Sequence, residues 1–153
     1  MKEGFLLGML LCAGLAFAEG FELVTAERVA PILVAAGEPG YVRLAAEDLA
    51  SDVQKITGKR PDVLADGPAP AGACVMIGTK AGGPWESYRV EAKGGRLVIE
   101  GGDARGTMFG VYAFIETSLK VDPLGFWSGV EPHQRAELKW PSVSLASGSP
   151  SFK

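Results

Sequence analysis

LVIEGGDARGTMFGVYAFIETSLK, residues 97–120, is the stretch that decides the fold. It opens with a short β-rich run, passes through two glycines and then places apolar residues at three- and four-residue steps from Met108 to Leu119. That spacing is typical of one face of an amphipathic helix. Asp103 stands just before this helix, where its carboxylate can accept hydrogen bonds from the first free backbone N–H groups. The stretch therefore predicts a strand, a tight turn and a capped helix in direct succession.

Two glycines and an arginine of this stretch carry further information. Gly106 and Gly110 lie four residues apart on the predicted helix, where the lack of a side chain lets a sheet or another helix approach closely, at a cost in helix propensity of about 1 kcal/mol each. Arg105 stands at the helix start, where its charge opposes the helix dipole, so we expect a partner for it. We interpret that partner as a carboxylate of the same chain; an anionic ligand or a neighbouring domain is the alternative.

Upstream, the pattern predicts a second helix between short strands. Residues 30–35 form an apolar run that ends at a Gly-Glu-Pro-Gly cluster, as a first strand would. In residues 41–57 the apolar positions recur at three- and four-residue steps, which predicts an amphipathic helix stopped by Gly58. Two more β-rich runs, 61–65 and 73–77, are separated by a turn-forming stretch. The order so far is strand, helix, strand, strand.

A hairpin completes the predicted sheet. Residues 87–92 and 96–100 alternate in character around Lys93-Gly94-Gly95, a turn typical of β-hairpins. The order strand, helix, two strands, hairpin, helix predicts an α/β (α+β) fold, in which a small mixed β-sheet carries two amphipathic helices mainly on one face. We assign this domain to residues 19–121.

The remaining residues, 122–153, are punctuated by glycines and prolines, so we expect an irregular C-terminal connector without a closing element. Phe126 and Trp127 lie in its glycine-flanked part. Aromatic faces in loops are suited to stacking on sugar rings, so these two are the candidate substrate contacts; burial against a neighbouring domain is an equal alternative. His133, the single histidine of the chain, is interpreted as a solvated loop residue.

The N-terminus has the layout of a secretion signal. Lys2 precedes the apolar stretch 5–17, which closes on the small-x-small triplet that ends at Ala18. We therefore expect a signal peptide over residues 1–18, a mature chain that starts at Glu19, and a secreted or periplasmic protein. Such a stretch is too short to span a bilayer, so we expect no membrane association after cleavage. Lipidation at Cys12 is the rival hypothesis, although large apolar residues precede this cysteine where a lipoprotein signal has a small one.

Composition limits the partners. The formal charge is -3, and cleavage after Ala18 leaves it unchanged because one lysine and one glutamate are removed. A mildly acidic chain without a Lys/Arg run gives little support for nucleic-acid binding. Cys74 is the one cysteine that remains, inside an apolar run, and we expect it to be a small buried residue.

Residues for catalysis or metal binding are not grouped in this sequence. One histidine makes a zinc site improbable, and no nucleophile stands in a known motif. A glycosidase needs two carboxyl groups that face one bond, and no such pair is evident; Glu47, Asp48 and Asp52 are interpreted as solvated residues on a helix face. We therefore predict no catalytic residue, no metal and no cofactor for this chain.

The most specific signal is Asp-x-Arg-Gly-Thr-x-x-Gly-x-Tyr, which opens a helix after an apolar strand and precedes an aromatic connector. Asp103, Arg105, Gly106, Thr107, Gly110 and Tyr112 occupy these places. The chain resembles the N-terminal, β-hexosaminidase-like α/β domain of large glycoside hydrolases, most closely family 115, the xylan α-glucuronidases. The Thr-Gly-Lys-x-Pro at 57–61 and the Ile-Gly-Thr at 77–79 fit the same domain. The resemblance implies that five of these residues form a structural motif: Asp103, Arg105, Gly106, Gly110 and Tyr112.

The resemblance also implies a function for a larger protein. Its catalytic carboxylates would lie in a barrel that follows this domain, and the parent would remove glucuronic acid from xylan without an organic cofactor. Our leading hypothesis is thus a non-catalytic N-terminal domain or fragment of an exported glycoside hydrolase, inactive alone, whose partners are the downstream barrel and the polysaccharide. A free-standing extracellular carbohydrate- or protein-binding module is the alternative, and a complete small hydrolase is a third.

Overall fold

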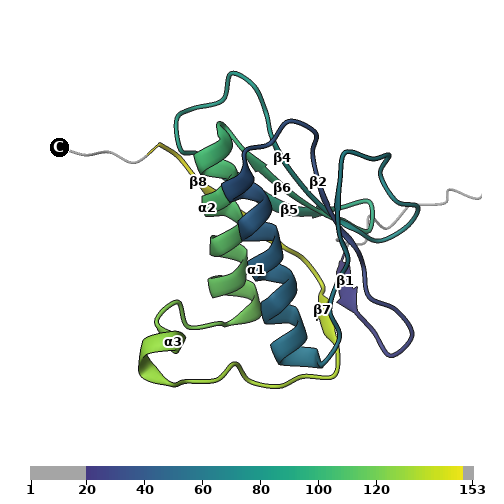
Figure 1. Ribbon diagram of the computed structural model, residues 1–153. Coiled ribbons are helices and arrows are strands. Elements are labelled where there is room, and N and C mark those ends of the chain that lie inside the picture. The colour runs from purple at the N-terminus through teal and green to yellow at the C-terminus, as the bar shows by residue number, and fades with distance from the viewer. Residues whose placement is uncertain (1–19, 150–153) are drawn as a thin grey trace, which may run out of the picture.

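A six-stranded mixed β-sheet forms the centre of the computed structural model, which describes residues 20–149 (Figure 1). Four strands run parallel, β5 is antiparallel to β6, and β8 is antiparallel to β5. In spatial order the strands are β3 (Val63–Ala65), β2 (Ile32–Val34), β4 (Val75–Thr79), β6 (Arg96–Gly101), β5 (Tyr88–Lys93) and β8 (Ser144–Ser147). The predicted mixed sheet is confirmed.

Two long helices pack side by side on one face of this sheet (Figure 1). The first, α1 (Gly40–Thr57), buries seven residues along one stripe and ends at Gly58, whose positive φ of 74° suits a glycine. The second, α2 (Ala104–Phe114), continues directly into a π-helical turn, η1 (Ile115–Leu119). Both helices agree with the apolar spacing of the sequence, and the π-helical turn is an addition that this spacing does not predict.

The core lies between the helices and the sheet because every second strand residue faces the helices. In β6 the alternate residues Leu97 and Ile99 are fully buried, as is Val90 of the neighbouring strand β5. Phe114 of α2 is also fully buried. Each such side chain contributes on the order of 1.5–3 kcal/mol by leaving water, so the two amphipathic stripes are what holds the layers together.

The predicted hairpin is confirmed. Strands β5 and β6 pair antiparallel up to Lys93 opposite Arg96. Between them, Gly94 and Gly95 both have positive φ, 60° and 71°. A two-residue turn with positive φ at both positions matches the twist of the flanking strands, which explains the two adjacent glycines.

The N- and C-terminal parts of the described chain contain strands that the sequence pattern does not reveal. A strand β1 (Phe21–Val24) precedes the run taken as the first strand, and it pairs antiparallel with β7 (Leu138–Trp140) in a second, two-stranded sheet. A short helix, α3 (Gly125–Ser128), precedes β7, and β8 extends the large sheet. The expectation of a tail without a closing element was wrong, because strands of three or four residues are too short to show a period.

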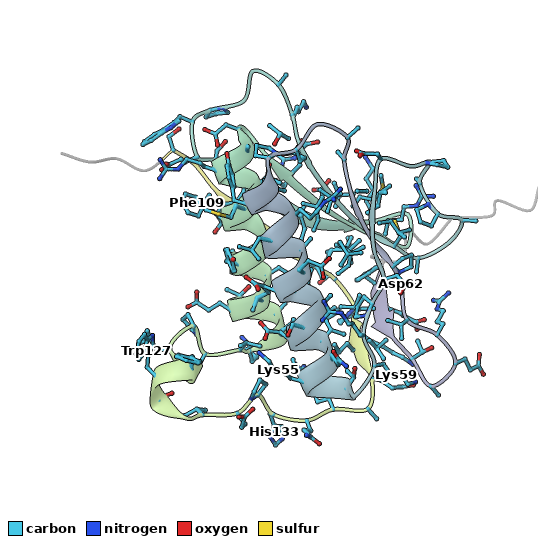
Figure 2. All side chains as sticks on the ribbon, in the orientation of Figure 1. Lys55, Lys59, Asp62, Phe109, Trp127 and His133 are labelled. Carbon is cyan, nitrogen blue, oxygen red and sulfur yellow. The ribbon has the colours of Figure 1, made fainter. Side chains whose placement is uncertain are left out.

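Three smaller expectations concern single residues and the N-terminus. Cys74 is fully buried, as predicted, and burial raises the pKa of its thiol. His133 is exposed in the connector, also as predicted (Figure 2). The expected signal peptide, its cleavage after Ala18 and the rival lipidation at Cys12 lie outside the described residues. Over residues 20–149 no helix combines the length and the apolar character needed to cross a membrane.

Candidate functional site

Asp103 is the N-cap of α2, as the sequence predicts. Its Oδ1 accepts a hydrogen bond from the backbone N–H of Gly106 (2.7 Å), and its Oδ2 accepts one from the backbone N–H of Glu86 (3.0 Å). These two backbone donors lower the pKa of the Asp103 carboxyl, the Gly106 bond being the larger cause. The carboxylate thus ties the loop before β5 to the start of α2 and satisfies the helix N-terminus internally.

The glycines of the motif allow the backbone of this loop to touch α2. A Cβ on Gly106 would overlap the carbonyl oxygen of Ser87, and one on Gly110 would lie 3.0 Å from Cγ2 of Ile99 and 3.2 Å from Cβ of Tyr88. The close approach that we expected from the two glycines is therefore present. Its physical reason is packing of α2 against the β5–β6 hairpin.

Arg105 has the partner that we interpreted for it. Its guanidinium lies 2.9 Å from Oε1 of Glu86, whose side chain is only 5% exposed. The two groups are close enough for an ion pair, but the geometry is not that of a hydrogen bond, so this oxygen of Glu86 has no hydrogen-bond donor. The guanidinium also lies 5.9 Å from the centroid of the Phe109 ring, which is labelled in Figure 2. Arg105 compensates a buried carboxylate in a residue with positive φ, 52°.

A second polar group at the same edge of the sheet escaped the sequence analysis. Glu38, which follows β2, accepts from the backbone N–H of Thr79 (2.6 Å) and from its hydroxyl (3.0 Å). The Thr79 hydroxyl also lies 2.8 Å from the hydroxyl of Thr107 on α2. The carboxyl ends of parallel strands are the usual place for ligands in α/β folds. Here, however, these side chains satisfy one another, and their role is to join β2, β4 and α2.

The surface that could hold a ligand is a cleft of about 640 Å³ between the two long helices and the connector, called here the helix–connector cleft. Its floor comes from α1, the end of α2 and η1, and its wall comes from residues 121–132. The lining comprises Asp48, Ser51, Asp52, Lys55, Tyr112, Ile115, Glu116, Val121, Asp122, Pro123, Gly125, Phe126, Val130, Glu131 and Pro132. A second hollow, of about 500 Å³ beside β1 and β7, is more open, and its lining includes Gly20, Gly95 and Pro141.

The shape of the cleft is set by how the connector is attached at both ends. At its start, η1 ends at Lys120 in the left-handed conformation (φ 61°), which turns the chain away from the helix axis. At its far end, the guanidinium of Arg135 donates to the carbonyl oxygen of Leu119 (2.6 Å), and its backbone N–H donates to the carbonyl oxygen of Ile56 (2.9 Å). The loop between these points therefore stands off the helices, with α3 at its tip (Figure 1).

The two predicted substrate contacts lie on α3 and differ in position. Phe126 is 90% exposed and lines the cleft, whereas Trp127, 82% exposed, lies outside the described lining, on the outer side of the α3 loop (Figure 2). Their ring centroids are 5.3 Å apart and the rings are nearly perpendicular, at 88°. No bound molecule tests a contact with substrate, so that role stays a prediction for both.

Tyr112 links the motif to the cleft, a role that the sequence did not indicate. Its hydroxyl donates to Oδ2 of Asp48 at 2.7 Å and so bridges α2 to α1. Partial burial, with the Asp48 carboxylate as the second cause, raises the pKa of Tyr112 to about 12. The phenol is therefore neutral and fixed as a donor. Within residues 20–149 no donor reaches the other Asp48 oxygen, which can accept from a ligand.

The remaining ionisable groups of the cleft are mostly carboxylates. Asp52 forms an ion pair with Lys55 (2.9 Å), and Asp122 accepts from the backbone N–H of Leu124 (2.8 Å). The side chains of Glu116 and Glu131 have no partner among residues 20–149. The described part of the chain contains no group of three or more His, Cys, Asp or Glu residues that could hold a metal ion. The cleft can thus accept hydrogen bonds from a ligand at several points and present an aromatic face.

Comparisons with known proteins show the fold. No protein-family model and no curated protein matches the chain. Among solved structures, a family GH115 4-O-methyl-α-glucuronidase with specificity for decorated arabinogalactans is similar to it, with a TM-score of 0.63 and 19% sequence identity over 82% of this chain. The matched part is 18% of that enzyme's chain. A GH138 enzyme that targets pectin rhamnogalacturonan II gives a TM-score of 0.47 and 13% identity over 57% of this chain and 10% of its own.

Proposed function

We propose that this chain is the non-catalytic N-terminal domain of an exported glycoside hydrolase that acts on plant polysaccharide such as glucuronoxylan. The observation that carries the proposal is the fold: 82% of the chain superposes on less than a fifth of a large α-glucuronidase. The Asp-x-Arg-Gly-Thr motif, on which the resemblance to the same family depends, forms structural contacts at Asp103, Arg105 and Gly106. In this reading the chemistry belongs to a barrel that follows the domain.

The condition of the carboxylates supports an accessory role. Hydrolysis of a glycosidic bond needs two carboxyl groups at a defined separation, one of which transfers a proton while the other acts as base or nucleophile. In the cleft, one oxygen of Asp48 accepts from the Tyr112 hydroxyl, and Asp52 forms an ion pair with Lys55. The pKa of Asp103 is lowered, which is the opposite of what a general acid needs. The carboxylates of Asp48, Asp52 and Asp103 therefore have structural partners, which favours a structural role for them.

A free-standing binding module is the second candidate, and the helix–connector cleft with its exposed Phe126 is the observation that favours it. The two functions differ in what the gene encodes after residue 153. An accessory domain requires a barrel in the same reading frame, whereas a free-standing module requires none. Sequencing of the genomic reading frame beyond Lys153 separates them directly.

Export is part of the proposal and has its own test. N-terminal sequencing of the secreted protein should begin at Glu19, because Ala16 and Ala18 supply the small residues that signal peptidase requires. A product that begins at a lipidated Cys12 would replace the expectation of no membrane association with a membrane-anchored protein. A product that keeps residues 1–18 inside the cell would remove export from the proposal altogether.

A further inference from the structure

The charge of the helix–connector cleft does not suit the sugar that a glucuronidase releases. Five carboxylates line it, those of Asp48, Asp52, Glu116, Asp122 and Glu131, against the single ammonium group of Lys55. Five negative charges and one positive give the lining a net charge of -4, although the whole chain carries only -3. A concentration of one sign inside a concave surface repels a ligand of the same sign.

We propose that this cleft binds a neutral segment of a polysaccharide in preference to uronic acid residues. The inference rests on the proposed function, because it takes a plant polysaccharide as the ligand class, but it concerns a site outside the catalytic barrel. Its consequence is a division of labour: the cleft holds the uncharged backbone or side chain, and the charged sugar is recognised elsewhere.

The hydrogen-bonding groups of the cleft match the hydroxyls of a neutral sugar. An ionised carboxylate only accepts hydrogen bonds, and a sugar hydroxyl donates one readily, which gives a charge-assisted bond. Glu116 and Glu131 have no partner within residues 20–149, and Asp48 has one oxygen that the Tyr112 hydroxyl does not use. Lys55 and Ser51 add donors for ring and hydroxyl oxygens of the sugar.

The aromatic wall and the size of the cleft point to the same ligand class. The ring of Phe126 is almost fully exposed and faces a volume of about 640 Å³, within the usual range of about 300–1,000 Å³ for binding pockets. An aromatic face next to convergent polar groups is the combination that a ring with an apolar C–H face and a hydroxyl rim requires. The ring of Trp127 lies edge-on to that of Phe126, with the centroids 5.3 Å apart, so the proposal gives it a positioning role.

Isothermal titration calorimetry with the purified protein tests the proposal with three probes of equal length. We expect xylohexaose to bind, and a hexamer of galacturonic acid to bind about tenfold more weakly at low ionic strength because of like-charge repulsion. A glucosamine hexamer, whose ammonium groups the carboxylates attract, should bind at least as tightly as xylohexaose at low ionic strength. Raising the salt concentration should strengthen binding of the acidic hexamer and leave that of xylohexaose unchanged, because salt screens only the charged contact.

Matched variants locate the site. Phe126→Ala should reduce xylohexaose affinity by about tenfold, the loss of one stacking contact, and Trp127→Ala should reduce it less; Trp85→Ala, an exposed aromatic away from the cleft, is the control and should have no effect. The double variant Glu116→Gln and Glu131→Gln should bring the affinity for the acidic hexamer closer to the affinity for xylohexaose. The control Glu27→Gln removes an exposed carboxylate outside the cleft and should leave both affinities unchanged. Circular dichroism of each variant verifies that the fold is retained.

Three results would overturn the proposal: equal or tighter binding of the acidic hexamer at low salt, binding of the glucosamine hexamer alone, or no binding of any probe by a folded protein. The second result would identify the cleft as a site for cationic ligands. None of the three changes the assignment as an accessory domain, which depends on hydrolysis and on the reading frame. Failure of the inference and failure of the proposed function are therefore distinguishable.

Discussion

Replacing Gly106 by alanine tests the packing that the motif produces. The residue lies in the first turn of α2, where the carbonyl group of Ser87 passes directly over its Cα. A Cβ there would overlap the Ser87 carbonyl oxygen and would also lie 3.0 Å from its carbonyl carbon and 3.1 Å from the carbonyl carbon of Glu86. All three are backbone atoms, so no side-chain rotation relieves the overlap. The loop that carries Glu86 and Ser87 must move away from α2.

The size of the effect follows from two opposing terms. Forced overlap in a packed region costs up to about 3 kcal/mol, and the higher helix propensity of alanine returns about 1 kcal/mol. We expect a net loss of up to about 2 kcal/mol, which lowers the melting temperature by up to roughly 4–8 °C for a chain of this size. The displaced loop also loses the hydrogen bond that the Ser87 carbonyl accepts from Gly102, which adds to the loss.

Urea unfolding followed by circular dichroism measures this difference, with Gly40→Ala as the matched control. Gly40 is also in the first turn of a helix, but a Cβ there meets nothing within 4 Å. The control should therefore be neutral or slightly more stable than the natural protein. If Gly106→Ala is as stable as Gly40→Ala, the close approach of the loop to α2 is not what the motif provides, and the structural reading of the motif is wrong.

Three further predictions concern single side chains. Arg105→Ala should cost about 1–3 kcal/mol in urea unfolding, because Glu86 stays buried without its charge partner; unchanged stability would refute the ion-pair role. The folded-state pKa of Asp103 is lowered, so its stabilisation is complete above the unfolded value of about 3.9 and is lost as pH falls through the folded value. The stability advantage over Asp103→Asn should therefore hold at neutral pH and shrink as pH falls below about 4, and a constant difference would contradict this. The pKa of Tyr112 is raised to about 12, so its neutral phenol stabilises the fold below about pH 10 and this contribution is lost as pH rises toward 12; ultraviolet titration should show one late phenol that Tyr112→Phe removes.

Long elements with a clear period were predictable from the sequence. The helix over residues 40–57 repeats its apolar stripe through several turns, and the hairpin combines alternation with two adjacent glycines. The cap at Asp103 was predictable because its partners are local: the first bond goes to a residue three positions along. Interactions between residues that are close in the sequence can be predicted from a short stretch of it.

Features that join distant residues were not predictable in the same way. Strands β1, β7 and β8 have three or four residues each, and their pairing depends on partners more than 50 positions away. The bond between Glu38 and Thr79 spans 41 positions. The signal for it was present in part, since Thr79 ends a strand and Glu38 follows one, but only the strand order shows that β2 and β4 are neighbours.

The helix–connector cleft depends on the same kind of distant contact. Phe126 was identified from its type and its glycine-flanked surroundings, but the cleft that it lines requires the π-helical turn and the bond from Arg135 to Leu119. Neither feature has a sequence period. Part of the cleft lining comes from α1, more than 70 positions before Phe126, so only the folded chain brings Asp48 and Asp52 into the same cleft.

The central claim is that this domain performs no hydrolysis itself and serves a catalytic domain encoded after it. The most direct test is the release of sugar from glucuronoxylan, from arabinogalactan and from a panel of aryl glycosides, measured for the purified 153-residue chain and for the product of the complete reading frame. We predict turnover by the longer product alone. Turnover by the short chain that survives repurification would contradict the account.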